Sequence, residues 1–338
     1  MPDQSANPDI GRDITVLVPA YQCASQLSDH SKTLQRYRKL GCSVMWVVSP
    51  SPDGSEKLAR TICQKTGDAF LLSPPGLYES WNFGITRVST EFLAVSTIGD
   101  FYLNDNLLAM AKLLKELSAD VCFTPPSFEG LSKNQIRGFS SWPVFTFARQ
   151  LEPFSGKICS VQLLIAAQVR GGLSCLLGSW ASNIARTSAM KSRPFPLNFG
   201  HYGDTAWFYQ HLLDLRVAFL KDPVSLFHFH PQPSSRKGSP KLAVLHSRQL
   251  PIELFRRARP RGLWLKDSFR FYRRYYSTLY ILNKNRGPHP KKFWWLHPKN
   301  WVLRLMRNWR HSQFLKWCEK WNFSAQSFDY LSRTNQKF

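Results

Sequence analysis

Two aspartates stand at positions from which a carboxylate can reach a bound molecule. Asp100 follows an apolar run of strand length, residues 92–96, and a carboxylate just past the carboxyl end of a central strand lies where open α/β sheets bind ligands. Asp204 follows Gly203 and precedes an amphipathic helical pattern at 205–215, so its side chain can face a cleft. Carboxylates take up protons and bind Mg²⁺ or Mn²⁺. The structural alternatives are a loop aspartate bonded to its own backbone for Asp100 and a helix N-cap for Asp204.

The elements that must position these aspartates alternate between strand and helix. We expect strands at residues 13–19, 43–48, 69–72, 92–96, 120–124, 217–220 and 224–230, and helices at 27–40, 55–64, 78–88, 107–117 and 205–215. The strands are apolar nearly throughout, which is typical of strands that are covered on both faces. Strands that alternate with helices at this spacing predict a doubly wound, mostly parallel α/β sheet (Rossmann-like) with helices on both faces.

The positive charge of the chain is concentrated in its last third. The 338 residues carry a net charge of +23, and from residue 231 onward 24 lysines and arginines stand against 4 acidic residues. Seven of the 12 tryptophans lie in the same part. We therefore divide the chain into a disordered lead-in at 1–12, an α/β domain at 13–231, and a basic, aromatic, mainly helical extension at 232–338. Helices that combine tryptophan and leucine with arginine suit a membrane surface.

The cysteines and the apolar segments argue against a disulfide-bonded, a zinc-binding and a membrane-spanning protein. The seven cysteines include no CxxC pair, which argues against a zinc site or a disulfide framework and predicts buried thiols in a reducing compartment, the cytoplasm. The best candidate for a membrane span, residues 161–180, contains Gln162, Gln168 and Arg170. A span needs about 20 predominantly apolar residues, so we reject this one.

Four motifs occur in an order that matches a known family. The first strand ends in Pro19-Ala20-Tyr21, and the second is followed by Asp53-Gly54-Ser55. Gly-Leu-Tyr-Glu-Ser-Trp-Asn-Phe-Gly-Ile stands at 76–85, before the strand that leads to Asp100, and Phe-Gly-His-Tyr-Gly-Asp-Thr-Ala-Trp stands at 199–207. Over residues 14–231 the chain resembles the family 2 glycosyltransferases of the GT-A fold, with their Pro-x-Tyr, Asp-Gly-Ser, Gly-Leu-Tyr-Asp-Ala-Trp-Asn-x-Gly-Ile and Glu-Asp regions.

The resemblance implies an inverting transfer of a sugar from a nucleoside-diphosphate sugar to an acceptor hydroxyl on a glycan, a lipid-linked acceptor or a surface polysaccharide precursor. It implies Asp204 as the general base. It also implies a set of donor-binding residues, which are Pro19, Ala20, Tyr21, Asp53, Asn82, Asp100 and Arg186. For a bound Mg²⁺ or Mn²⁺ it implies Asp100 and His230 as ligands. Alternatives remain: strand-end packing for Pro19 to Tyr21, a helix cap for Asp53, loop fixing for Asn82, a solvated arginine for Arg186, and a surface or core histidine for His230.

Two stretches depart from the family pattern. Val48-Ser49-Pro50 stands where the family has an aspartate that reads the nucleotide base, and Thr97 and Gly99 occupy the two acidic positions of its Asp-x-Asp metal motif. A catalytically degenerate GT-A protein that binds sugar or acts as a scaffold is therefore an alternative. A nucleic-acid-binding protein is another, because arginine interleaved with tryptophan suits single strands, although no RNP, KH or helix-turn-helix motif is present. As an enzyme, the protein is expected in the cytoplasm, with its extension on an anionic membrane surface.

Overall fold

The computed structural model describes residues 8–103, 106–128, 143–146, 151–171, 175–227 and 249–263, the last range without 252 and 255. Contacts divide the chain into two units, Met1–Phe269 and Arg270–Phe338, and all described residues belong to the first. Of the basic extension at 232–338, only part of 249–263 is described, so the two helical patterns that we expect further along lie outside the described residues.

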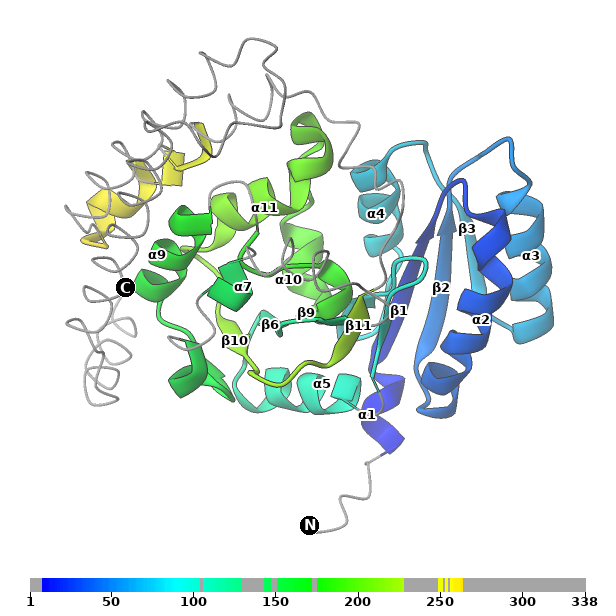
Figure 1. The fold of residues 1–338 in the computed structure, drawn as a ribbon, viewed down its shortest axis with the longest axis horizontal. Coiled ribbons are helices and arrows are strands. Elements are labelled where there is room, and N and C mark those ends of the chain that lie inside the picture. Colours follow the sequence, from blue (N-terminus) through cyan, green and yellow to red (C-terminus); the bar gives the residue numbers. More distant parts are fainter. Residues whose placement is uncertain are drawn as a thin grey trace, which may run out of the picture. The chain divides into compact units, whose positions relative to one another are not determined.

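An eight-stranded sheet forms the centre of the first unit (Figure 1). Its strand order is β3-β2-β1-β4-β9-β6-β10-β8. β1 (Ile14–Ala20) pairs in parallel with β2 (Ser43–Val48) and with β4 (Phe92–Val95), and β2 pairs in parallel with β3 (Ala69–Leu72). Every residue of β4 is buried, as is expected for a strand between two helical layers. The predicted α/β fold with a mostly parallel sheet is confirmed.

Three helices cover one face of this sheet. They are α2 (Ala24–Lys39), α3 (Ser55–Thr66) and α5 (Asn106–Glu116). Leu34 of α2 belongs to the same buried cluster as Val16 of β1, and so do side chains of α3 and α5. Because side chains alternate along a strand, the neighbours of Val16 in β1 point to the other face.

The short helix α4 (Leu77–Ile85) lies against that other face of β1 and β2. It approaches β1 and β2 so closely that a Cβ atom at Gly84 would lie 2.6 Å from Val47 and 2.8 Å from Leu17. Both separations are shorter than carbon atoms tolerate, so only glycine permits this packing. The chain thus crosses from one face to the other before it forms β4, which is the doubly wound arrangement.

The second half of the sheet is mixed. β6 (Val121–Phe123), β10 (Val217–Phe219) and β8 (Lys157–Ile158) extend it, with β10 parallel to β6 and antiparallel to β8. β9 (Asn183–Arg186) is inserted antiparallel between β4 and β6. We did not expect a strand there, because a four-residue segment whose partners lie more than about 60 residues away carries no local signal.

A second, three-stranded sheet lies beside the exit from β4. It contains β5 (Phe101–Tyr102), β11 (Ser225–Phe227) and β7 (Ser127–Phe128). β11 runs antiparallel to β5, with Leu226 opposite Phe101. The strand predicted at 224–230 is therefore described only up to Phe227.

The remaining elements are short helices. They are α1 (Pro8–Arg12), α7 (Pro143–Thr146), η1 (Glu152–Phe154), α9 (Val161–Gly171), η2 (Trp180–Ser182), α10 (Thr187–Ser192), η3 (Leu197–Tyr202), α11 (Gly203–His211) and η5 (Arg259–Arg261). Helix α1 corrects the prediction that 1–12 is disordered throughout, since Ile10 packs against the core. Within the described residues, none of the helices is both long and apolar enough to cross a membrane.

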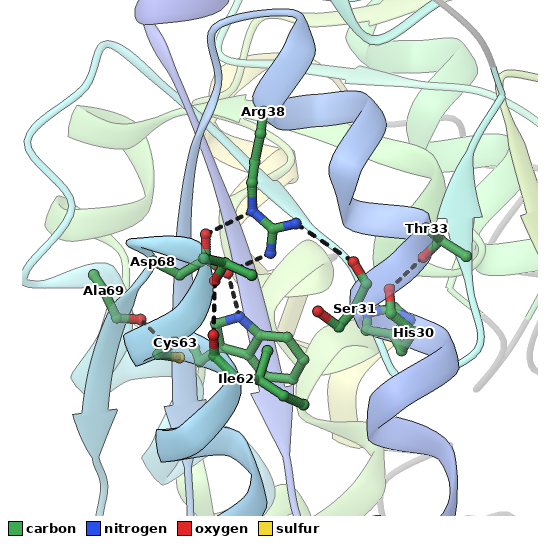
Figure 2. Close-up of polar contacts among 10 residues, drawn as sticks. His30, Ser31, Thr33, Arg38, Ile62, Cys63, Asp68 and Ala69 are labelled. Atoms are coloured by element: carbon green, nitrogen blue, oxygen red, sulfur yellow. Dashed lines mark hydrogen bonds and ion pairs between the residues drawn. The ribbon is translucent and has the colours of Figure 1, made fainter.

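Asp68 ties the end of α2 to the sheet. Its carboxylate accepts hydrogen bonds from Nε and Nη2 of Arg38, at 2.7 and 2.5 Å, and from Nε1 of Trp46 at 2.9 Å. Figure 2 shows Arg38 above Asp68, with His30 on the same helix. The Asp68 side chain is only 4% exposed, and a bidentate pair between arginine and carboxylate is the strong form of this contact. The cluster therefore holds α2 in place along β2.

We predict that Asp68→Ala lowers the free energy of unfolding by about 3 kcal/mol, because it leaves a largely buried guanidinium and an indole N–H without their acceptor. Urea denaturation of the purified protein measures this change. The matched control is Asp29→Ala, which removes an exposed ion pair with Lys32 and is expected to change almost nothing. Equal losses in the two variants would contradict the role assigned to the cluster.

Candidate functional site

The candidate site lies at the carboxyl ends of β1 and β4. The two strands are neighbours, but the chain leaves β1 for β2 on one side and returns to β4 on the other, so the strand order reverses between them. The loops that follow such a pair diverge and leave a crevice in which open α/β sheets bind ligands. The segments that leave the sheet at this edge are residues 21–23, 49–54, 73–76 and 96–100.

Asp100 ends the turn that follows β4. Its backbone N–H donates to the Thr97 carbonyl at 2.8 Å, and the Thr97 hydroxyl donates to Oδ2 of Asp100 at 2.5 Å. The Ser96 hydroxyl donates to the Asp100 carbonyl at 2.9 Å, and Asp100 is only 2% exposed. The carboxylate thus stabilises its own turn through the Thr97 hydroxyl, whereas a bond to its own backbone, the alternative considered for it, stays a prediction. Its contact with a donor or a metal stays a prediction.

His30, which is not among the site residues predicted from the sequence, lies under the same turn. The Gly99 N–H donates to Nδ1 of His30 at 3.2 Å, and Nε2 lies 3.4 Å from the Ser96 hydroxyl. His30 is 3% exposed, and burial lowers the pKa of its imidazole to about 4. Its spacing from the buried Leu27 and Leu34 places it on the apolar stripe of α2. That spacing could have marked His30 as a buried histidine, but the turn that it contacts is not visible in the sequence.

Asp204 lies in the first turn of α11, one residue inside the helix, and is not its N-cap. Its Oδ1 accepts the Thr205 N–H at 2.6 Å and the Thr205 hydroxyl at 3.3 Å. Burial raises the pKa of Asp204 to about 6, against the opposing effect of hydrogen bonds from Thr205 and the Tyr78 hydroxyl. Such a carboxylate is mostly ionised at neutral pH and still accepts a proton readily, which is what a general base requires.

Tyr78 brings Asp204 to the carboxyl edge of the sheet. α4 starts at this edge and runs back along the sheet, so its first turn, which includes Tyr78, lies there. The Tyr78 ring lies directly over Gly203, where a Cβ atom would be 2.4 Å from two ring carbons, and it stacks on Phe195 at 5.2 Å between centroids. The Tyr78 hydroxyl lies 3.4 Å from the His201 carbonyl. The motif at 76–85 and the motif at 199–207 are therefore in direct contact.

Asn82 fixes a loop one turn further along α4. Its Nδ2 donates to the Phe195 carbonyl at 2.8 Å, and its Oδ1 accepts the Phe195 N–H at 2.9 Å. Both ends of the side-chain amide are used, so the loop-fixing alternative describes what Asn82 does in this structure. It holds the ring of Phe195 where Tyr78 stacks on it.

Pro19, Ala20 and Tyr21 end β1 in the expected place. The Ala20 carbonyl accepts the Ser49 N–H at 3.0 Å, so Pro19 and Ala20 still belong to the paired strand. Tyr21 is 56% exposed, although large aromatic side chains are usually covered. Its ring is available to stack on a flat ligand at the switch point.

Asp53 ties the turn after β2 to the start of α2. Its carboxylate accepts the Ala24 N–H at 3.0 Å, the Ser55 N–H at 3.1 Å and the Ser51 hydroxyl at 2.8 Å. Residue 54 is the N-cap of α3, so Asp53 is not the N-cap itself, although its carboxylate accepts the N–H of the first residue of α2 and of α3. The structural role is thus clear, and a contact with the donor stays a prediction.

Arg186 lies at the opposite edge of the sheet from Asp100 and Asp204. It pairs with Phe92, the first residue of β4, because β9 runs antiparallel to β4. Its guanidinium donates to the Ala119 carbonyl at 2.9 Å and to the Leu114 carbonyl at 3.0 Å, and it also pairs with Glu91. The structure therefore does not bring Arg186 to the candidate site, and we leave it out of the site proposed below.

A metal site is not formed by the described residues. Among them there is no group of three or more His, Cys, Asp or Glu side chains that could hold a metal ion, and His230 lies outside them. Mg²⁺ and Mn²⁺ prefer several oxygen ligands, whereas Asp100 is the one acidic residue of the segment 96–100 and already accepts a bond from Thr97. The described donor set does not fit either ion.

Comparison with known proteins identifies no family for the chain. No family model matches it, and no curated protein matches it. The chain is similar to the solved structure of S. aureus TarS 1-349, at 16% identity over 63% of this chain and 59% of that one, with a TM-score of 0.46, and it covers 43% of a longer TarS chain. The complex of TarS 1-349 with UDP-GlcNAc matches at 14% identity over 72% of each chain, with a TM-score of 0.49.

Glucosyl-3-phosphoglycerate synthase from Mycobacterium tuberculosis, in complex with Mn²⁺, UDP and glucosyl-3-phosphoglycerate, matches at 16% identity. The match covers 72% of this chain and 79% of that chain, with a TM-score of 0.46. The TM-scores of these structures lie below 0.5. The function proposed below therefore rests on the residues of this chain.

We predict that Gly203→Ala lowers the free energy of unfolding by about 2 kcal/mol, because the new methyl group drives the Tyr78 ring off its stack on Phe195. Gly203 has a helical φ of −59°, so the backbone itself accepts alanine. Urea denaturation measures the loss. In a Tyr78→Leu background, which lacks the ring, the same methyl group is expected to cost much less. An equal cost in both backgrounds would show that the ring does not set the requirement for glycine.

Proposed function

We propose that this protein is an inverting glycosyltransferase of the GT-A type, which transfers a sugar from a nucleoside-diphosphate sugar to an acceptor hydroxyl. The observation that carries the proposal is Asp204, a carboxylate with a pKa of about 6 that the Tyr78 ring contact places at the carboxyl edge of the sheet. Two motifs far apart in the sequence meet at this carboxylate, and both resemble pieces of the family 2 enzymes. Their contact supports a common site.

The proposed reaction uses Asp204 as its base. The acceptor hydroxyl gives its proton to the Asp204 carboxylate as the acceptor oxygen attacks the anomeric carbon of the donor sugar. The bond between that carbon and the phosphate oxygen breaks, and its electron pair leaves with the nucleoside diphosphate. Attack from the side opposite to the leaving group inverts the configuration at the anomeric carbon. The Tyr78 hydroxyl, which lies 3.4 Å from the His201 carbonyl, also lowers the pKa of Asp204 and so favours the ionised carboxylate.

The donor is proposed to lie across the ends of β1 and β4. The exposed ring of Tyr21 is suited to stack on the nucleotide base, next to Pro19 and Ala20. Thr97 and Gly99 are partly exposed at the turn after β4, where the diphosphate would pass. Asp53, Asn82 and Asp100 all make structural hydrogen bonds around this edge, so we assign them the shaping of the site, and a direct contact with the donor stays a proposal for Asp53 and Asp100.

Charge on the leaving diphosphate must be met by positive charge. Asp100 and His230 stay the proposed ligands for Mg²⁺ or Mn²⁺, but because the described residues do not form a metal site, we derive no step through an ion. The incomplete Asp-x-Asp motif also favours the second candidate function, a degenerate transferase that binds sugar without turnover. Slow hydrolysis of a nucleotide sugar in the absence of acceptor distinguishes the enzyme from that module.

The basic extension is proposed to bring the enzyme to its acceptor in the cytoplasm. Each lysine or arginine near an anionic membrane contributes about 1 kcal/mol to binding, so a segment with a net charge of +20 needs only a few of them in contact. An acceptor at such a surface would be a glycan carried on a lipid or a polysaccharide precursor. Flotation with anionic vesicles, compared with a gel shift on single-stranded RNA, separates this role from nucleic-acid binding.

We predict that one nucleoside diphosphate out of UDP, GDP, CDP and ADP raises the melting temperature of the protein in a thermal shift assay with and without Mn²⁺. A ligand at a hundred times its Kd adds about 2.7 kcal/mol to the free energy of unfolding, which is readily seen. Asp204→Asn should bind the same nucleotide and lose at least about 100-fold in the rate of sugar release, because it lacks the base. A folded protein that responds to none of the four would refute the proposed function.

We predict that the rate of sugar transfer rises with pH and levels off above a midpoint near 6. The base acts only when ionised, and burial raises the pKa of Asp204 to about 6, so the rate is lost as the pH falls through that value. Initial rates between pH 4.5 and 8, at a saturating concentration of the nucleotide sugar that the thermal shift assay selects, give the profile. A midpoint near 4, the value of an ordinary aspartate, would contradict the assignment of Asp204 as the base.

A further inference from the structure

The imidazole of His30 bonds to the buried side of the turn after β4. His30 contacts both ends of the turn, the N–H of Gly99 through Nδ1 at 3.2 Å and the hydroxyl of Ser96 through Nε2 at 3.4 Å. The Ser96 hydroxyl donates in turn to the carbonyl of Asp100 at 2.9 Å. The three contacts form one connected chain of hydrogen bonds under residues 96–100.

The direction of these hydrogen bonds fixes the state of the ring. Because the Gly99 N–H can only donate, Nδ1 carries no proton, and the neutral ring then carries its proton on Nε2. Nε2–H donates to Ser96, which leaves the Ser96 hydroxyl free to donate to Asp100. Burial lowers the pKa of His30 to about 4, so the ring is neutral and keeps this pattern at physiological pH.

The His30 ring also contacts the sheet, through Trp46 of β2. It packs edge-on against Trp46, with 6.1 Å between ring centroids. Nε1 of Trp46 donates a hydrogen bond to Asp68. Asp68 pairs with Arg38, which lies further along the same helix as His30 (Figure 2). The imidazole therefore packs against Trp46 and bonds to the turn.

The turn closes on itself between Thr97 and Asp100, and His30 accepts the Gly99 N–H in addition to these bonds. Gly99 has a φ of +95°, a conformation that few residues other than glycine adopt, and its N–H points into the protein. The polar groups of Ser96 and Asp100 are also buried, whereas Thr97, Ile98 and Gly99 keep part of their surface exposed at the switch point. The buried hydrogen bonds of the turn thus set the positions of Thr97, Ile98 and Gly99 on its exposed side.

We propose that His30 is a positioning residue for the donor site: it locks the turn 96–100 in the shape that a nucleoside diphosphate meets. This inference rests on the proposed function for the identity of the ligand, whereas the lock itself can be tested without any ligand. The role is positional because the ring is buried beneath the turn, so it acts on the donor only through Ser96 and Gly99.

Three variants distinguish the loss of the hydrogen bonds between His30 and the turn from a general loss of stability. His30→Leu removes both hydrogen bonds at nearly the same volume. His30→Asn keeps an acceptor at the position of Nδ1 and can still receive the Gly99 N–H. Leu34→Ala is the matched control, since Leu34 is fully buried on the same stripe of α2 but is not among the groups that bond the turn.

Hydrogen exchange measured by mass spectrometry tests the lock directly. In His30→Leu, peptides that span 96–102 should exchange about tenfold faster than in the wild type, as expected when a buried hydrogen bond is lost, while the other strands are unchanged. In His30→Asn the increase should be within about threefold. Unchanged exchange in His30→Leu, or an equal increase of the same peptides in Leu34→Ala, would overturn the proposal.

Calorimetric titration with UDP, GDP, CDP and ADP tests the consequence for the donor site. The nucleotide that binds the wild type should bind His30→Leu about tenfold more weakly and should bind His30→Asn and Leu34→Ala nearly as well as the wild type. Equal affinity in His30→Leu would overturn the positioning role. If none of the four binds the wild type, the proposed function fails, and the exchange experiment still decides whether His30 locks the turn.

Discussion

The contact between the Tyr78 ring and Gly203 is the interaction on which the site depends. It joins the first turn of α4, which follows β3 at the carboxyl edge of the sheet, to the first turn of α11, which follows η3 much later in the chain. Only a glycine at position 203 allows the ring to approach so closely. Because Asp204 is the next residue, the same contact sets both the position and the burial of its carboxylate, and burial is what raises its pKa.

The sheet supplies the second half of the geometry. The strand order reverses between β1 and β4, and the exposed ring of Tyr21 and the turn 96–100 follow the ends of these two strands. The crevice outside such a reversal is where open α/β sheets bind ligands. The polar side chains around this edge are mostly engaged with the protein itself: Asp53 with α2, Asn82 with Phe195, and Asp100 with Thr97. They give the crevice its shape and leave Asp204 as the carboxylate best suited to chemistry.

Local patterns predicted the first half of the fold well. The strands 43–48 and 69–72 have the predicted bounds, because apolar runs between turn residues are a local signal. Where contacts are distant in the sequence, prediction failed or was silent. The antiparallel direction of β9 cannot be read from four residues, and that direction is what carries Arg186 to the wrong edge for a donor contact. His30 was not predicted as a site residue, because the turn that it contacts lies 66 residues away from it in the Ser96 contact.

The most direct test of the account is a crystal structure of Asp204→Asn with the nucleotide sugar that stabilises the wild type. We expect the nucleotide to lie over the ends of β1 and β4, with the diphosphate against the turn 96–100. The side chain at position 204 should face the anomeric carbon from the side opposite to the diphosphate. A nucleotide sugar bound at another edge of the sheet, or with its anomeric carbon turned away from position 204, would contradict the assignment of this edge as the active site.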